Sequence, residues 1–151
     1  MANAEDEGLD TALQILGRSP VYTDLGYMER AQEVIDLHPL GSSSLAVPTW
    51  FYGHEPTNFF SRHVAKYFSN SIREDGLLAI ATYGIIYAPG SAGTTQEIFM
   101  DATQNHYGTF KLVSPMMFFD REYWTKTRPV YDAVQNLAEG RQYASFIDIT
   151  D

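Results

Sequence analysis

The fold class of this chain is indicated most clearly by residues 84–97, which read Gly-Ile-Ile-Tyr-Ala-Pro-Gly-Ser-Ala-Gly-Thr-Thr-Gln-Glu. Residues 84–88 form a short apolar run, which is typical of a buried strand. A turn follows at 89–94, and a helical segment begins at about Thr95. A buried strand that passes through a turn into a helix is the repeating unit of α/β proteins with parallel sheets.

The same alternation of elements continues on both sides of this stretch. Hydrophobic periodicity and turn residues predict helices at 9–16, 24–35, 60–68, 71–82, 95–104 and 123–137, and strands at 45–52, 84–88, 110–117 and 145–149. This order predicts an α/β fold with a Rossmann-like, three-layer α/β/α arrangement around a parallel sheet. Ligands of such sheets bind beyond the carboxyl ends of the strands, so the turn at 89–94 is the natural place for a site.

The composition argues against several classes of function. A chain of 151 residues that is 44% apolar can form one packed domain. Its net charge of −9 and the lack of a basic run argue against a nucleic-acid binder. The absence of cysteine removes disulfides and thiolate chemistry, and the four histidines lack metal-binding spacing. The acidic N-terminus is unlike a signal peptide, and no apolar run is long enough to cross a bilayer. We expect a soluble cytoplasmic protein without a membrane partner or a metal site.

The turn and the start of the next helix allow two interpretations. Gly90 and Gly93 allow a ligand to approach the backbone closely, and the N–H groups at a helix start suit a phosphate, with hydroxyls from Ser91 and Thr94 in addition. Alternatively, Thr94 and Glu97 form a capping box, in which the glutamate only bonds back to the helix cap. The spacing alone leaves both interpretations open.

The nine residues Pro89 to Glu97 resemble a motif of the Lonely Guy (LOG) family of nucleoside 5′-monophosphate phosphoribohydrolases, formerly labelled lysine decarboxylase-like. The family motif is Pro-Gly-Gly-x-Gly-Thr-x-x-Glu, and this chain differs from it by having Ser91 at the second glycine. An apolar strand ending at Pro48 and an aromatic pair at Tyr123-Trp124 also fit the family layout. The resemblance implies that residues 1–151 are a single nucleotide-binding domain, the C-terminal part of a larger LOG-like domain whose N-terminal portion is missing.

The resemblance also implies an activity. LOG enzymes hydrolyse the N-glycosidic bond of a nucleoside 5′-monophosphate such as AMP, releasing free base and ribose 5-phosphate, without a cofactor, and they are commonly homodimers. By resemblance, Glu97 assists the attacking water or stabilises the oxocarbenium-like ribose. The phosphate is then held by Gly90, Ser91, Gly93 and Thr94.

The family places an arginine on the preceding helix, in a Met-x-x-Arg-Lys motif, and two arginines of this chain compete for that role. Arg73 lies at about the expected distance from Pro89 but is followed by Glu74, whereas Arg62 has a closer local context and lies further upstream. We favour Arg73 and keep Arg62 as the alternative.

Two other functions remain open beside hydrolysis. Ser91 and the missing N-terminal portion favour a non-catalytic nucleotide- or phosphate-binding module of the same superfamily, and a purely structural or assembly domain is the third possibility. Lysine decarboxylation is disfavoured, because no lysine lies in a setting suited to a pyridoxal Schiff base.

The sequence also predicts the environment of an aromatic stripe, of Asp101 and of His54. The aromatic stripe Phe59, Phe60, Tyr67 and Phe68 favours core packing, with a dimer interface as the alternative. Asp101 lies one turn beyond Glu97 on the same helix, and we expect it to be solvated; the alternative is that both carboxylates face one cleft, which would raise the pKa of one of them. His54 follows a predicted strand end and is expected to be a loop histidine without a role.

Overall fold

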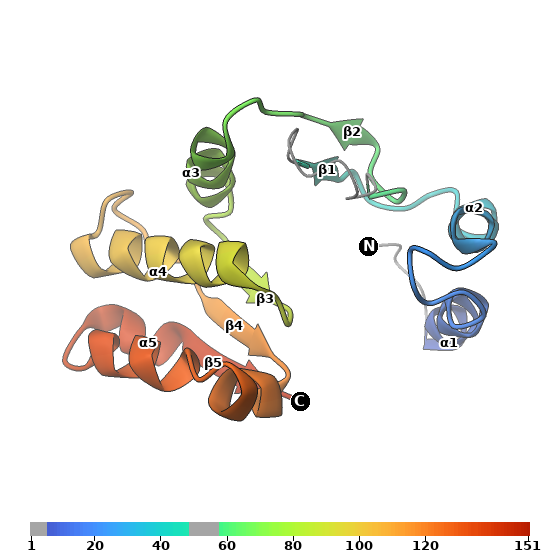
Figure 1. Ribbon diagram of the computed structural model, residues 1–151. Helices are drawn as coiled ribbons and strands as arrows, with labels where there is room; N and C mark the ends of the chain where they lie inside the picture. Colours follow the sequence, from blue (N-terminus) through green and yellow to red (C-terminus); the bar gives the residue numbers. More distant parts are fainter. Residues whose placement is uncertain (1–5, 49–57) are drawn as a thin grey trace. The chain divides into compact units, whose positions relative to one another are not determined.

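The computed structural model describes residues 6–48 and 58–151, and the chain forms two compact units, Met1–Asn70 and Ser71–Asp151. Helices and parallel strands occur in both units (Figure 1), which confirms the predicted α/β class with a Rossmann-like layout of small sheets. None of the helices in the described segments has the length and apolar character needed to cross a membrane. The predicted strand at 45–52 extends past residue 48, and that part lies outside the described residues, as does His54.

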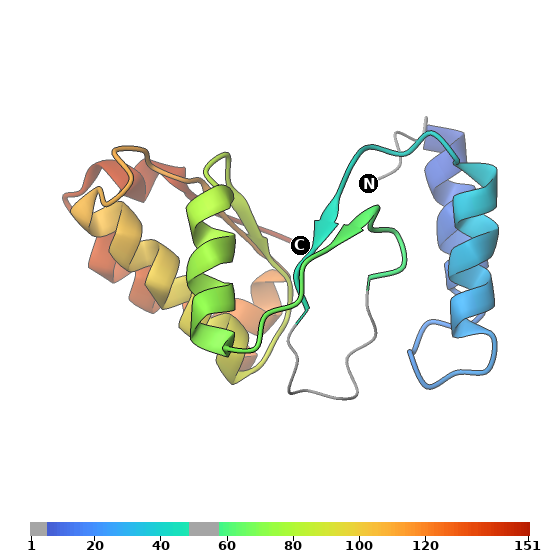
Figure 2. The same cartoon turned by 90° about the horizontal axis from the view of Figure 1, so that it is seen from above.

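The described residues of the first unit form two helices and one pair of short strands. Helices α1 (Asp6–Leu16) and α2 (Tyr27–Leu37) lie side by side (Figure 2), as their apolar spacing predicts. Strands β1 (Leu45–Ala46) and β2 (His63–Val64) pair in parallel.

The predicted helix at 60–68 is wrong, because this segment contains strand β2. A turn precedes the strand: the side chain of Asn58 accepts the Phe60 N–H at 3.0 Å, and its carbonyl accepts the Ser61 N–H at 3.1 Å. Such a side-chain bond to the backbone competes with helix formation. The expectation that the aromatic stripe is core is also wrong, because Phe59, Phe60, Tyr67 and Phe68 are 37–71% exposed.

The second unit contains the three-stranded parallel sheet, in the order β3-β4-β5. Its elements in chain order are α3 (Asn70–Ile80), β3 (Ile85–Tyr87), α4 (Ala92–Tyr107), β4 (Met116–Phe119), the π-helical turn η1 (Tyr123–Thr127), α5 (Tyr131–Ala138), the 3-10 helix η2 (Gln142–Phe146) and β5 (Ile147–Thr150). Tyr87 lies in register with Phe118, and Phe118 with Ile149.

The core of this unit lies between one face of the sheet and the helices α4 and α5, which lie side by side in Figure 1. Alternate strand residues point into it, among them Tyr87, Phe118 and Ile149, and Trp124 of η1 is fully buried against them. Residues on the opposite face of the sheet are open: Ile86 is 68% exposed and Phe119 48%. Side chains therefore alternate between buried and exposed along each strand, because one face of the sheet packs against the helices.

Two predicted elements of this unit have the wrong bounds. The strand expected at 110–117 begins only at Met116, because α4 continues to Tyr107 and the chain turns through Gly108 and Lys111, both with positive φ, before Pro115. The continuous helix expected at 123–137 is interrupted at Pro129, since the residue before a proline is driven out of helical geometry, and Arg128 has φ −136° and ψ 85°.

Candidate functional site

The candidate site begins where β3 ends, at residues 88–91, which we call the glycine turn. Helix α4 starts directly after it, with Ser91 as its N-cap residue, and the side chain of Ser91 makes no capping hydrogen bond. The first turn of α4 holds no acidic side chain, and Ser91, Ala92 and Gly93 are exposed to solvent. The positive end of the helix dipole is thus accessible and is not neutralised by the helix itself.

Position 90 needs a glycine because there is no room for a side chain, and not because its backbone has a positive φ. A Cβ at this position would lie 2.1 Å from Thr94 Oγ1 and 2.7 Å from Thr94 Cβ, so the helix start packs directly on the turn. Gly93 differs, because a Cβ there meets no atom within 4 Å. The two glycines that the sequence analysis grouped together therefore act in different ways.

The capping-box interpretation of Thr94 and Glu97 is wrong. Because α4 begins at Ala92, Thr94 lies inside the helix and cannot be its N-cap. The side chain of Glu97 instead points to helix α3, where Arg73 Nη2 lies 3.5 Å from its Oε1. At that distance the contact is an ion pair rather than a short hydrogen bond.

Arg73 also lies beside a second carboxylate. Its Nη2 is 3.7 Å from Oε1 of Glu74, a side chain that is fully buried. Gln96 Nε2 donates to the other oxygen of Glu74 at 2.7 Å. Consecutive residues of α4, Gln96 and Glu97, thus bond to consecutive residues of α3, which fixes the two helices next to the glycine turn.

Arg62, the alternative arginine, lies in the other unit. Its Nη2 donates to the carbonyl of Pro39 at 3.1 Å. Within the unit that contains the glycine turn, the structure brings Arg73 to Glu97.

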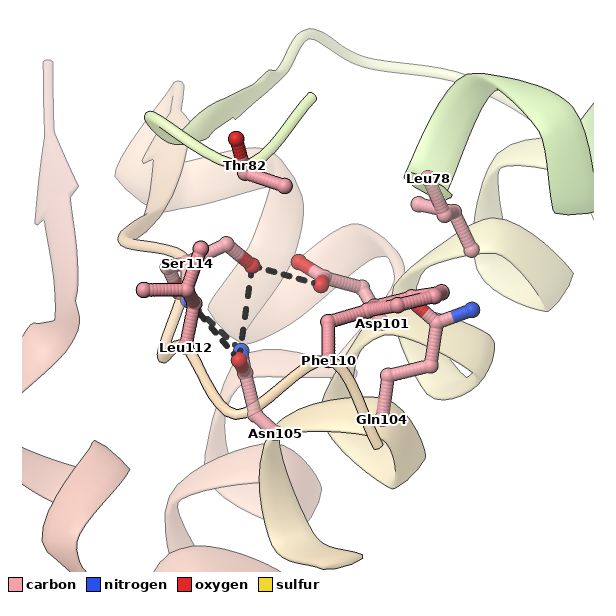
Figure 3. Close-up of a pocket in the computed structure, with 8 residues that line it drawn as sticks. All are labelled: Leu78, Thr82, Asp101, Gln104, Asn105, Phe110, Leu112 and Ser114. Carbon is pink, nitrogen blue, oxygen red and sulfur yellow. Dashed lines mark hydrogen bonds between the residues drawn. The ribbon is translucent and has the colours of Figure 1, made fainter. Parts of the chain in front are cut away.

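Asp101 is buried, so the expectation that it is solvated is wrong. It is 2% exposed, and each carboxylate oxygen accepts a hydroxyl at 2.7 Å, one from Tyr87 and one from Ser114. Asn105 exchanges two hydrogen bonds with the backbone of Ser114, and Figure 3 shows Asp101, Asn105 and Ser114 at the lining of a small pocket. The pocket is large enough for about one water molecule and is too small for a nucleotide. The cluster is a structural link between β3, α4 and the chain before β4.

Burial changes the acidity of two groups in this cluster. It raises the pKa of Asp101, an effect that the hydrogen bonds from Tyr87 and Ser114 oppose. Burial, and then the neighbouring carboxylate of Asp101, raise the pKa of the Tyr87 hydroxyl. Tyr87 therefore stays a donor at neutral pH.

Two consecutive aromatic residues of η1 hold the end of β3 and the glycine turn, a role that the sequence did not reveal. Tyr123 Oη donates to the carbonyl of Gly90 at 2.6 Å, and Trp124 Nε1 donates to the carbonyl of Tyr87 at 3.2 Å. The backbone N–H of Tyr123 is itself fixed by Asp120 Oδ1 at 2.9 Å. The signal in the sequence was the aromatic pair after a predicted strand. It marked the place of Tyr123 and Trp124 in the chain but did not show that they bond to Gly90 and Tyr87.

Neither a scan against protein-family models nor a search of curated proteins gives a match for this chain.

Proposed function

We propose that this chain acts as a LOG-like phosphoribohydrolase, a hydrolase that cleaves the N-glycosidic bond of a nucleoside 5′-monophosphate. The observation that carries the proposal is the ion pair between Arg73 and Glu97, at the start of a helix that opens with an exposed glycine turn. A carboxylate and a guanidinium then lie close to a place suited to a phosphate, which is the combination that the reaction needs.

The proposed division of labour follows from the positions of the groups. Gly90, Ser91, Gly93 and Thr94 surround the helix start and bind the 5′-phosphate through backbone N–H groups and hydroxyls. Glu97 lies about one helical turn further along α4, with its side chain 25% exposed, so its carboxylate can meet solvent and substrate.

In the proposed reaction a water oxygen bonds to C1′ of the ribose, and Glu97 accepts a proton from that water. The C1′–N bond breaks with its electrons going to the base, which takes up a proton as it leaves. The carboxylate also faces the positive charge that develops on the ribose in such cleavages. Arg73 keeps the carboxylate in place through the ion pair.

The experiment that tests the proposal is incubation of the purified protein with a panel of nucleoside monophosphates, with free base measured by chromatography. Glu97→Ala is expected to lower base release by about 10²-fold or more, since general acid–base groups contribute about 10² to 10⁴ in rate. Glu139→Ala removes an exposed carboxylate of the same unit and is the matched control. Unchanged activity of Glu97→Ala would show that this residue has another role.

A second candidate function is a non-catalytic nucleotide- or phosphate-binding module. Glu74 favours this binding module. Its buried carboxylate occupies the position of the lysine in the family motif, and it forms an ion pair with Arg73 in competition with Glu97. A rise in melting temperature with AMP, without turnover, would identify a binding module. A melting temperature that no nucleotide changes would point to the third candidate, an assembly domain.

A further inference from the structure

The carbonyl side of the glycine turn is fixed by side chains that the proposed reaction does not use. Tyr123 Oη donates to Gly90 at 2.6 Å, and Arg128 Nε donates to the same Tyr123 oxygen at 3.3 Å. The three groups form a chain of hydrogen bonds from a guanidinium through a phenol to a backbone carbonyl. In such a chain each bond polarises the next.

The π-helical turn η1 makes this chain possible. The Arg128 N–H bonds to the Tyr123 carbonyl at 2.7 Å, which joins residues five apart and not four apart as in an α-helix. The wider turn places Arg128 next to Tyr123, so that the two residues are joined by one hydrogen bond between their backbones and one between their side chains. In the part of the chain that the structure describes, Arg128 has no carboxylate partner, so its charge acts on the phenol.

The bond to Gly90 fixes the direction of a donor. The carbonyl of Gly90 and the N–H of Ser91 belong to one planar trans peptide group, in which they point in opposite directions. Because Tyr123 holds the carbonyl, the N–H of Ser91 is directed away from η1. Trp124 acts in the same way on the peptide group of Tyr87 and Ala88 through its bond of 3.2 Å.

We propose that Tyr123 is a positioning residue for phosphate recognition: its hydroxyl, polarised by Arg128, holds the glycine turn with the N–H of Ser91 directed at the 5′-phosphate. The inference rests on the proposed function, because it takes the phosphate of a nucleotide as the ligand of the turn. It adds the groups that set the geometry of that site and predicts that they discriminate a nucleotide from its nucleoside.

Isothermal titration of AMP and of adenosine into wild type and Tyr123→Phe tests this inference. Tyr123→Phe removes one hydroxyl and keeps the ring that packs on Trp124. We expect AMP to bind about three- to tenfold more weakly, as for the loss of one hydrogen bond, and adenosine binding to stay unchanged. Tyr131→Phe, which removes a hydroxyl bonded only to Gln135 among the described residues, is the control and should change neither affinity.

The possible results separate the inference from the proposed function. If wild type binds AMP more tightly than adenosine and Tyr123→Phe keeps that preference, the positioning role is overturned and the phosphate site stands. The same holds if the substitution lowers the affinities for AMP and adenosine equally. If the preference falls but wild type releases no base, the positioning role stands and hydrolysis is overturned. If wild type binds AMP no better than adenosine, both are overturned.

Discussion

The same substitution at two glycines of the candidate site should have opposite effects on stability. In Gly90→Ala the new Cβ would lie 2.1 Å from Thr94 Oγ1 and 2.7 Å from Thr94 Cβ. Rotation of the threonine moves the hydroxyl but not its Cβ, so the backbone of the turn has to shift. In Gly93→Ala the new methyl group meets no atom within 4 Å, on a helix whose φ is ordinary.

The expected magnitudes follow from these contacts. Overpacking costs about 1–3 kcal/mol, and the lower entropy of an unfolded alanine offsets about 0.4–1 kcal/mol of it, so Gly90→Ala should be destabilised by about 1–2 kcal/mol. Gly93→Ala should be stabilised by about 0.5–1 kcal/mol, because glycine is a poor residue for a helix. For a chain of this size 1 kcal/mol corresponds to a change in melting temperature of about 2–4 °C.

Urea unfolding of the two variants beside wild type measures this contrast directly, and AMP titration of the same samples adds a functional reading. Because the space beside Gly93 is open, we expect Gly93→Ala to weaken AMP binding while it raises stability. A Gly90→Ala protein at least as stable as wild type would refute the packing argument. A Gly93→Ala protein with full AMP affinity would show that the phosphate does not approach this position.

Three further predictions concern the buried polar groups. Asp101→Ala should lower the free energy of unfolding by about 2–4 kcal/mol in urea titrations, because it leaves two buried hydroxyls without their acceptor at about 1–3 kcal/mol each. The raised pKa of Asp101 means that its contribution to stability is present at low pH and lost as pH rises through the folded-state pKa. Asp101→Asn should therefore gain stability relative to wild type as the pH rises above about 4, and a difference that is independent of pH would contradict this. Arg73→Met should cost about 3 kcal/mol by thermal unfolding, since Glu74 stays buried without its guanidinium, and adding Glu74→Leu should recover most of the loss.

Local signals in the sequence were sufficient for the part of the second unit from α3 to the start of α4. The apolar run at 84–88 predicted β3, and the turn at 89–94 predicted the start of α4 to within about three residues, because a buried strand and a glycine turn leave few other structures. The prediction of α3 was also confirmed. The helix predicted at 60–68 was wrong, because the turn at Asn58 competes with helix formation and β2 pairs with β1, a strand distant in sequence.

The candidate site shows the same division between local and long-range information. The motif identified Glu97 and the glycines, and distance along the chain favoured Arg73, which the structure places 3.5 Å from Glu97. The burial of Asp101 could not be predicted, because it depends on Tyr87 and Ser114, which come from other elements. The role of Tyr123 was hidden for the same reason, since its partner Gly90 is 33 residues away in sequence.

Base release from AMP by wild type and Glu97→Gln, with AMP binding measured on the same samples, shows whether the Glu97 carboxylate takes part in hydrolysis. Glu97→Gln keeps the shape of the side chain and removes its capacity to accept a proton. We expect free adenine and ribose 5-phosphate from wild type, a rate lower by about 10² or more in the variant, and nearly equal AMP affinity of the two proteins. Equal rates in the two proteins, or no base release from any nucleoside monophosphate by wild type, would contradict this expectation.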